Sequence, residues 1–136
     1  MKIGIGCDHG GIVLKDACID ALSELGMEYI DYGTFSNESV DYPDFASKVA
    51  KAVLSKEVDK GILLCGTGIG ISIAANKFRG IRCAEHNDAN IIAMGGRITT
   101  PCDAKAMVKA FLTTQFAGGR HSLRLDKIKE IEKNYL

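Results

Sequence analysis

The sequence predicts a three-layer α/β/α fold, in which an open parallel sheet of about five strands carries helices on both faces. Strand-like and helix-like segments alternate from one end of the chain to the other. The strand-like segments are also continuous apolar runs, as in parallel strands that are buried on both faces. The 136 residues, 46% of them hydrophobic, are enough for a single domain over residues 1–136.

The predicted strands are short apolar runs bounded by turn residues. They lie at residues 3–7, 27–31, 58–64, 81–84 and 91–94. Such a sheet is Rossmann-like, and ligands then bind beyond the carboxyl ends of the strands, where the strand order reverses. The segments that follow the first and third strands, at Asp8 and Cys65, therefore belong to the same edge of the molecule.

Helical patterns fill the intervals between these strands. The first places apolar side chains at a spacing of four from Val13 to Leu25, and Gly26 ends it. Pro43 and Pro101 each favour the start of a helix. The predicted helices cover residues 12–25, 43–54, 70–77, 101–113 and 120–134, and the last of them is charged and amphipathic.

One connection is too short for this fold. Six residues, 85–90, separate the last two predicted strands, whereas parallel neighbours need a crossover of about a dozen residues. Either the two strands are not parallel, or a crossover segment is absent from the chain. We expect residues to be missing between Ala84 and Glu85. A Cα–Cα distance well beyond about 3.8 Å would confirm this, and a normal bond in a well-formed turn would refute it.

Composition argues against several classes of protein. Seventeen basic and seventeen acidic residues cancel, which favours neither nucleic acid nor an anionic membrane as a partner. No apolar run approaches the roughly 18 residues of a membrane span. The five cysteines include no C-x-x-C pair, which disfavours zinc and redox motifs. A strand begins at once, without a secretion signal, so we expect a reduced, cytoplasmic protein.

The most informative segment is Cys65, the glycine-rich run Gly66–Gly70 and the helix after it. Such glycines let backbone N–H groups turn toward a ligand, and the helix start adds the positive end of its dipole. These surroundings suit an anion, and they also lower the pKa of a thiol from its free value of about 8.5. The segment therefore offers a proton carrier beside an oxyanion hole. The alternative is a buried, inert cysteine before an ordinary tight turn.

Two further polar segments contain histidine, the side chain that exchanges protons near neutral pH. Asp8 and His9 follow the first strand and precede two glycines. The alternative is an aspartate that caps a loop beside an exposed histidine. His86 and Asn87 precede the last strand, where the alternative is a polar turn.

Arginines near the C-terminus supply a candidate phosphate site. Arg120 and Arg124 lie four residues apart on the last predicted helix, so they share one face. Their planar guanidinium groups suit a phosphate, although the alternative is a solvated helix face. Arg97, which follows two glycines, is a similar but weaker candidate.

Together these residues favour an acid–base enzyme that acts on a small phosphorylated substrate. Residues 66–70 do not match G-x-G-x-x-G, and the chain has no P-loop motif, so nucleotide binding is poorly supported. A cysteine phosphatase loop would need arginine six residues after Cys65, where the chain has Ile71.

Six segments, in order along nearly the whole chain, resemble the ribose-5-phosphate isomerase type B family. They are residues 6–11 (GCDHGG), 38–44 (ESVDYPD), 65–70 (CGTGIG), 74–77 (AANK), 85–90 (EHNDAN) and 118–121 (GGRH). The wider family includes galactose-6-phosphate isomerase subunits and isomerases of allose 6-phosphate. The chain departs from the resemblance before Glu85, where the family has a longer connection.

The resemblance implies an aldose–ketose isomerase that converts ribose 5-phosphate to ribulose 5-phosphate through a cis-enediolate, without metal or cofactor. Cys65 would carry the proton between C1 and C2, because no carboxylate stands at Ile71 or beside it. His86 would assist opening of the furanose ring. The enediolate oxygen would be held by Thr67 and the amides of Gly66, Gly68, Ile69 and Gly70.

The same resemblance implies how the substrate is held. Asp8 and Asn87 would bind sugar hydroxyls, and Tyr42 would line the sugar pocket. The phosphate would be held by His9, Arg120 and Arg124, with Arg97 beside them. The site would be shared between two subunits of a homodimer, or of a tetramer of two dimers, with the C-terminal helix packed on the partner.

Two alternatives stay open. The first is the same chemistry on a six-carbon sugar phosphate, which the depth of the pocket would decide. The second is a non-catalytic module that binds sugar phosphates, which would need the glycine-rich turn and the arginines but not the Cys65 thiol.

Overall fold

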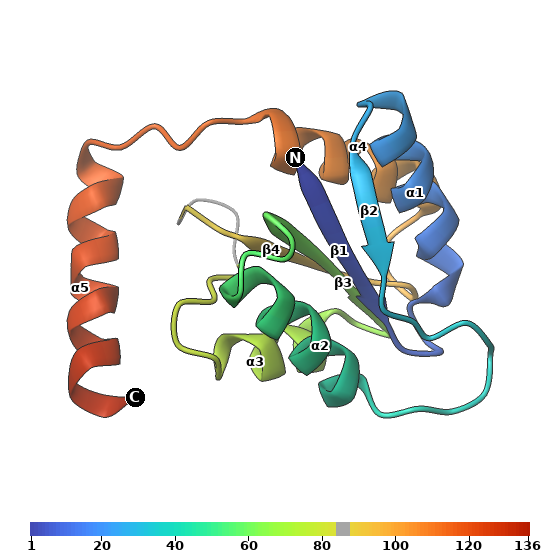
Figure 1. Ribbon diagram of the computed structural model, residues 1–136, viewed down its shortest axis with the longest axis horizontal. Helices are drawn as coiled ribbons and strands as arrows, with labels where there is room; N and C mark the ends of the chain where they lie inside the picture. Colours follow the sequence, from blue (N-terminus) through green and yellow to red (C-terminus); the bar gives the residue numbers. More distant parts are fainter. Residues whose placement is uncertain (84–87) are drawn as a thin grey trace.

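Four parallel strands form the sheet of this computed structural model, which describes residues 1–83 and 88–136 (Figure 1). Their order is β2-β1-β3-β4, and all three pairings are parallel. The strands are β1 (Lys2–Cys7), β2 (Glu28–Asp31), β3 (Lys60–Cys65) and β4 (Ile91–Gly95). The parallel sheet that the apolar runs predicted is therefore confirmed.

Helices cover both faces of the sheet (Figure 1). One face carries η1 (Ile12–Leu14), α1 (Lys15–Glu24) and α4 (Pro101–Thr113), and the other carries α2 (Tyr42–Leu54) and α3 (Ile69–Asn76). The boundaries agree with the predicted helices to within one or two residues, apart from the short 3₁₀ turn that opens the first. The three-layer arrangement is confirmed.

The core has two halves, one on each face of the sheet. Successive side chains of a strand point to opposite faces, so Ile62 and Leu64 of β3 pack under α1 and α4. Leu63 and Cys65 pack instead toward α2 and α3. Because both faces are buried, the strands can be apolar throughout.

The strand predicted over residues 81–84 is wrong for the part of it that is described. Cys83 makes a single parallel bridge to Ile91, and residues 81 and 82 pair with no strand. A longer parallel pairing would need a crossover of about a dozen residues, which the chain between Cys83 and Ile91 does not provide. The described sheet therefore has four strands rather than five. The predicted gap between Ala84 and Glu85 lies outside the described residues.

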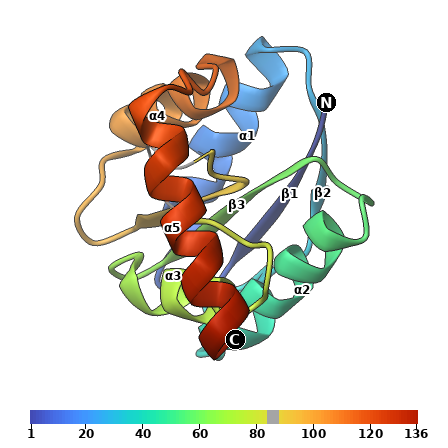
Figure 2. The same ribbon diagram turned by 90° about the vertical axis from the view of Figure 1, so that its left-hand side faces the viewer.

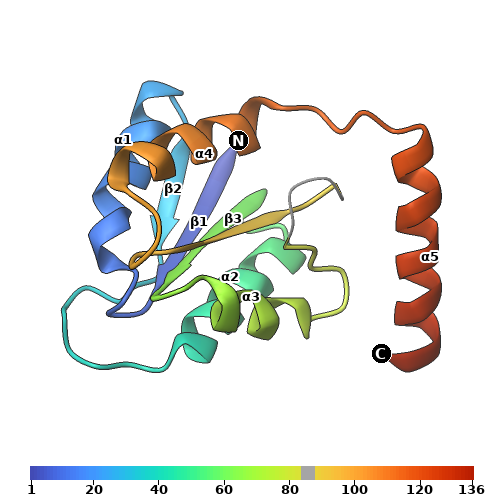
Figure 3. The same ribbon diagram turned by 180° about the vertical axis from the view of Figure 1, so that it is seen from behind.

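Helix α5 (Arg120–Tyr135) stands apart from the three layers, at the end of an extended connection (Figures 1 and 3). Figure 2 shows it crossing in front of the edge of the sheet that β4 forms. Its large apolar side chains Leu123, Ile131 and Tyr135 are exposed, whereas Leu125 is buried. No helix within the two described ranges is both long and apolar enough to cross a membrane.

Candidate active site

A cavity of about 300 Å³ opens at the carboxyl ends of β1 and β3. The chain runs from β1 to β2 on one side and from β3 to β4 on the other, so this is the point where the strand order reverses. Its lining residues are Asp8, His9, Gly10, Tyr42, Cys65, Gly66, Thr67, Gly70 and Arg97. All of these except Gly10 are residues that the sequence predicted for the site.

Cys65 is the last residue of β3 and is 4% exposed. The backbone N–H of Gly68 donates to its sulfur over 3.1 Å, and α3 begins at the next residue. The sulfur therefore faces a backbone donor at the positive end of a helix dipole. Gly68 has φ 79°, and a Cβ there would lie 2.9 Å from the backbone carbon of Met94, so the turn requires glycine.

Two amides of the glycine-rich turn donate within the protein. Gly68 N–H donates to Cys65, and Ile69 N–H donates to the Thr67 hydroxyl oxygen over 3.3 Å. Gly68 and Ile69 line a second, larger cavity of about 710 Å³ and not the cavity that contains Cys65. Gly66, Thr67 and Gly70 are the part of the turn that faces the Cys65 cavity.

Asp8 is held rigidly at the cavity wall. Its Oδ1 accepts hydrogen bonds from Gly10 N–H (2.8 Å) and Gly11 N–H (3.1 Å), and the residue is 6% exposed. The aspartate thus does cap its own turn, as the alternative interpretation predicted. It also lines the cavity, so both interpretations hold for the same side chain.

His9 and Tyr42 come from different elements and are each fixed by a neighbour. Val40 N–H donates to His9 Nδ1 over 3.2 Å, so the proton of the neutral ring is carried by Nε2. The Tyr42 ring packs against Gly70, where a Cβ would lie 2.7 Å from the ring carbon Cζ. Because Gly70 has no side chain, the Tyr42 ring can occupy the space beside it.

Arg97 is the arginine that lines the cavity, although the sequence favoured Arg120 and Arg124. Its backbone N–H donates to the Gly66 carbonyl oxygen over 2.9 Å. The central carbon of its guanidinium, Cζ, lies 3.2 Å from where a Cβ on Gly66 would stand. Arg120 and Arg124 are exposed on α5, which stands apart from the three layers (Figure 1), and neither lines the cavity. His86 and Asn87 lie outside the described residues.

The other buried cysteines belong to the core. Cys7 of β1 and Cys18 of α1 are fully buried in the core between the sheet and the helices α1 and α4. Burial raises the pKa of the Cys7 thiol and raises the pKa of Cys18 to about 12. Cys65 is thus the buried cysteine whose surroundings include a cavity and a backbone donor.

Sequence reasoning missed two features of the site. Gly10 lines the cavity, and its presence in the GCDHGG segment was the available signal. The Val40 N–H that orients His9 lies in the ESVDYPD segment, but a backbone donor leaves no signal in a side-chain pattern.

Comparison with known proteins gives one consistent result. The family model described as Ribose/Galactose Isomerase matches residues 3–128. Ribose-5-phosphate isomerase B of Escherichia coli is 51% identical, over 97% of this chain and 97% of that protein. A solved structure of ribose-5-phosphate isomerase B from Clostridium thermocellum superposes with a TM-score of 0.94 at 55% identity, covering 100% of both chains.

A putative sugar phosphate isomerase of Bacillus subtilis is 49% identical, and its alignment covers 100% of both chains. That alignment runs over 149 positions, which is 13 more than the 136 residues of this chain. The relative therefore has residues that this chain lacks.

Proposed function

This chain belongs to the Ribose/Galactose Isomerase family, and on that premise we propose that it interconverts ribose 5-phosphate and ribulose 5-phosphate. The observation that carries the proposal is the Cys65 sulfur, which meets a backbone donor in a cavity that His9 and Arg97 also line. The printed activities of the relatives from E. coli and C. thermocellum support the choice of substrate.

In the proposed reaction the Cys65 thiolate removes the proton from C2 of the open-chain aldose. The C–H electrons form the C1–C2 double bond of a cis-enediolate, and the π electrons of the C1 carbonyl move onto O1, which becomes the negative oxygen. The thiol then returns the proton to C1, while the proton of the C2 hydroxyl passes to O1. The resemblance to the family implies neither metal nor cofactor. His86 is proposed to open the sugar ring beforehand.

The negative oxygen of the enediolate needs donors that are already in place. The amides of Gly68 and Ile69 donate within the turn, so we assign this role to Thr67, Gly66 and Gly70, which line the cavity. One such preorganised donor typically lowers the barrier by about 3–4 kcal/mol.

The remaining lining residues divide between the two ends of the substrate. Asp8 and Tyr42, with Asn87, are proposed to hold the sugar hydroxyls, since they offer acceptors and donors at the cavity wall. His9 Nε2–H and the Arg97 guanidinium are proposed to hold the phosphate.

We further propose a homodimer, or a tetramer of two dimers, because Arg120 and Arg124 do not line the cavity of their own chain and their helix, α5, stands apart from the three layers (Figure 1). In the dimer α5 packs on the partner subunit and carries both arginines to the partner's cavity. The larger cavity next to β4 is bordered by the exposed side chains Ile69, Ile73 and Ile98, which suits such an interface. We also propose that the protein is located in the cytoplasm.

A six-carbon sugar phosphate is the second candidate substrate, because the family description also names galactose. A non-catalytic module is less well supported, since binding alone does not need a thiol at the base of the cavity.

The substrate is tested by assaying the purified protein with ribose 5-phosphate and with allose 6-phosphate, in metal-free buffer with a chelator. Turnover of the pentose is expected. Turnover of only the hexose would move the proposal to the second candidate. Binding without turnover of either sugar would indicate a module that does not catalyse.

The shared site is tested by mixing two inactive variants, Cys65→Ala and Arg120→Ala/Arg124→Ala, under conditions that exchange subunits. If the arginines act across the interface, each mixed dimer has one intact site, and about a quarter of all sites regain activity. If the arginines act within their own chain, no mixed dimer has an intact site, and no activity returns.

A further inference from the structure

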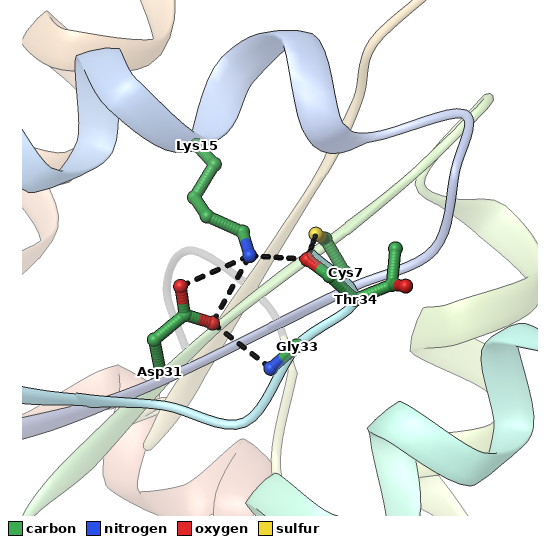
Figure 4. Close-up of polar contacts among 5 residues, drawn as sticks. All are labelled: Cys7, Lys15, Asp31, Gly33 and Thr34. Carbon is green, nitrogen blue, oxygen red and sulfur yellow. Dashed lines mark hydrogen bonds and ion pairs between the residues drawn. The ribbon is translucent and has the colours of Figure 1, made fainter. Parts of the chain in front are cut away.

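A largely buried ion pair joins α1 to the end of β2 and has no part in the proposed reaction (Figure 4). Lys15, the first residue of α1, is 6% exposed, and its Nζ lies 3.0 Å from Asp31 Oδ2 and 3.1 Å from Oδ1. Replacing a buried ion pair by apolar side chains is often neutral or stabilising, because the charges lose their hydration. Stability alone therefore does not account for an ammonium group at this position.

The pair fixes the segment that follows β2. Lys15 Nζ donates to the Thr34 carbonyl oxygen, and Asp31 Oδ1 accepts the Gly33 N–H over 2.9 Å (Figure 4). Gly33 and Thr34 in turn exchange backbone hydrogen bonds with Cys7, both of 2.6 Å. Lys15 thus joins α1 to the segment after β2. That segment is bonded in turn to Cys7, the residue directly before Asp8 and His9.

The loop of residues 35–41 runs from this anchor to the cavity. Its first side chain, Phe35, lies under Lys15, with Nζ 4.6 Å from the ring centroid. Residues 35–39 are exposed. The loop meets the cavity again at Val40, whose N–H donates to His9 Nδ1, and α2 begins two residues later. Lys15 and His9 are therefore the two ends between which the loop is held.

We propose that Lys15 is a positioning residue for substrate binding. It holds Thr34 and Phe35 so that the Val40 N–H stays on His9 Nδ1 and the His9 Nε2–H faces the cavity. This inference rests on the proposed function at one point, the role of His9 in binding the phosphate of the substrate. Lys15 itself is buried and touches no substrate.

The kinetic test is Lys15→Met, which keeps the chain length and removes the ammonium. The KM for ribose 5-phosphate should rise about tenfold while kcat stays within about twofold, because a phosphate contact and not the proton transfer is lost. The matched control is Lys109→Met, which removes a lysine that pairs with Glu24 on the outer surface. It should leave both constants unchanged.

A double-mutant cycle tests the route through His9. In a His9→Ala background, Lys15→Met should raise KM no further, because the group that Lys15 positions is already gone. An additive rise in KM would overturn the proposal.

A readout without turnover comes from ¹⁵N spectra of the histidine rings. The wild-type protein should show His9 with Nδ1 unprotonated and Nε2 protonated, and Lys15→Met should lose that single tautomer. An unchanged His9 tautomer would overturn the proposal whatever the KM. This measurement also decides the role of Lys15 if ribose 5-phosphate is not the substrate.

Should Lys15→Met alone fail to fold, the same measurements are made on Lys15→Met/Asp31→Asn. That variant leaves no unpaired carboxylate and keeps an oxygen for the Gly33 N–H.

Discussion

The two central strands end alike in sequence and differ in what their ends do. β1 ends in Cys7 and β3 in Cys65, and each cysteine is followed by a turn that contains glycines. In the sheet Cys7 is aligned with Leu64, so the two cysteines differ by one residue in register and face opposite layers. Because of this shift of one residue in register, the Cys7 thiol lies in the core and the Cys65 thiol lies at the cavity.

The turns after the two cysteines also use their amides differently. After β1 the Gly10 and Gly11 amides converge on the Asp8 carboxylate, and the Cys7 thiol donates to the Thr34 carbonyl oxygen over 3.7 Å. After β3 the Gly68 amide donates to the Cys65 sulfur. The chemistry of a strand-end cysteine is therefore set by register and by the following turn, not by the residue type.

The largest effect should come from removing the thiol of Cys65. Cys65→Ala should lower kcat by about a thousandfold, since the proton carrier is lost, while binding of the sugar phosphate is kept. Steady-state kinetics and calorimetric titration measure the two quantities.

Cys7→Ala is the matched control for this loss. It should leave kcat within about twofold and lower the free energy of unfolding by about 1 kcal/mol, as for other small core truncations. Equal kinetic effects of the two substitutions would remove the distinction between the strand ends.

The buried core cysteines and Cys65 should also differ in the rate at which their thiols are alkylated. Burial raises the pKa of Cys7, and raises that of Cys18 to about 12, so neither forms appreciable thiolate at pH 8. Iodoacetamide should modify Cys65 and the exposed Cys102 at least about a hundredfold faster, as followed by peptide mass spectrometry. Bound substrate should protect Cys65 and leave the rate at Cys102 unchanged. Modification of Cys18 at a similar rate would contradict the comparison.

Glycine substitutions should affect folding at one strand end and substrate binding at the other, because an added Cβ meets backbone at Gly11 and a side chain at Gly70. A Cβ at Gly11 would lie 2.4 Å from the backbone carbon of Leu64, so Gly11→Ala should cost about 3 kcal/mol of folding free energy. At Gly70 the Cβ would meet the Tyr42 ring, a side chain that can move. Gly70→Ala should therefore fold and raise KM about tenfold, because Tyr42 leaves its place in the cavity. Chemical denaturation and kinetics decide between these outcomes.

The sequence predicted the parts of the molecule that depend on local pattern. The helix over residues 101–113 has the predicted bounds, since Pro101 and the Thr100 side chain at its start act locally. The cavity turn was also predicted, because Cys65 and its glycines are consecutive in the chain. The strand predicted over residues 81–84 was wrong for residues 81–83, because the short connection to β4 leaves room for a single bridge from Cys83 and no longer pairing.

Contacts between distant residues left no comparable signal. A lysine near a helix start is normally exposed, and Lys15 is buried only because Asp31 and Thr34 meet it from the end of β2. Arg97 was ranked below the α5 pair because its distance from Gly66 depends on the pairing of β3 with β4. In both cases the tertiary fold, and not the spacing along the chain, gives the residue its place.

The smallest effect should come from breaking the ion pairs between α1 and α4, the helices that cover Cys7. Glu24 of α1 pairs with Lys105 and Lys109 of α4, and the hydrogen bonds from these lysines lower its pKa to about 2. The folded-state pKa is below the unfolded value, so the stabilisation is complete above about pH 4.5 and is lost as the pH falls toward 2.

The Glu24 side chain is 49% exposed, so solvent screens the pair and the effect on stability is small. Glu24→Gln should lower the melting temperature slightly at pH 7, flatten its fall between pH 4.5 and 2, and leave kcat and KM unchanged at neutral pH. The difference between wild type and variant should shrink further in high salt. A change in kcat would mean that the layer over Cys7 is coupled to the cavity at Cys65, and the two strand ends could then no longer be treated as independent.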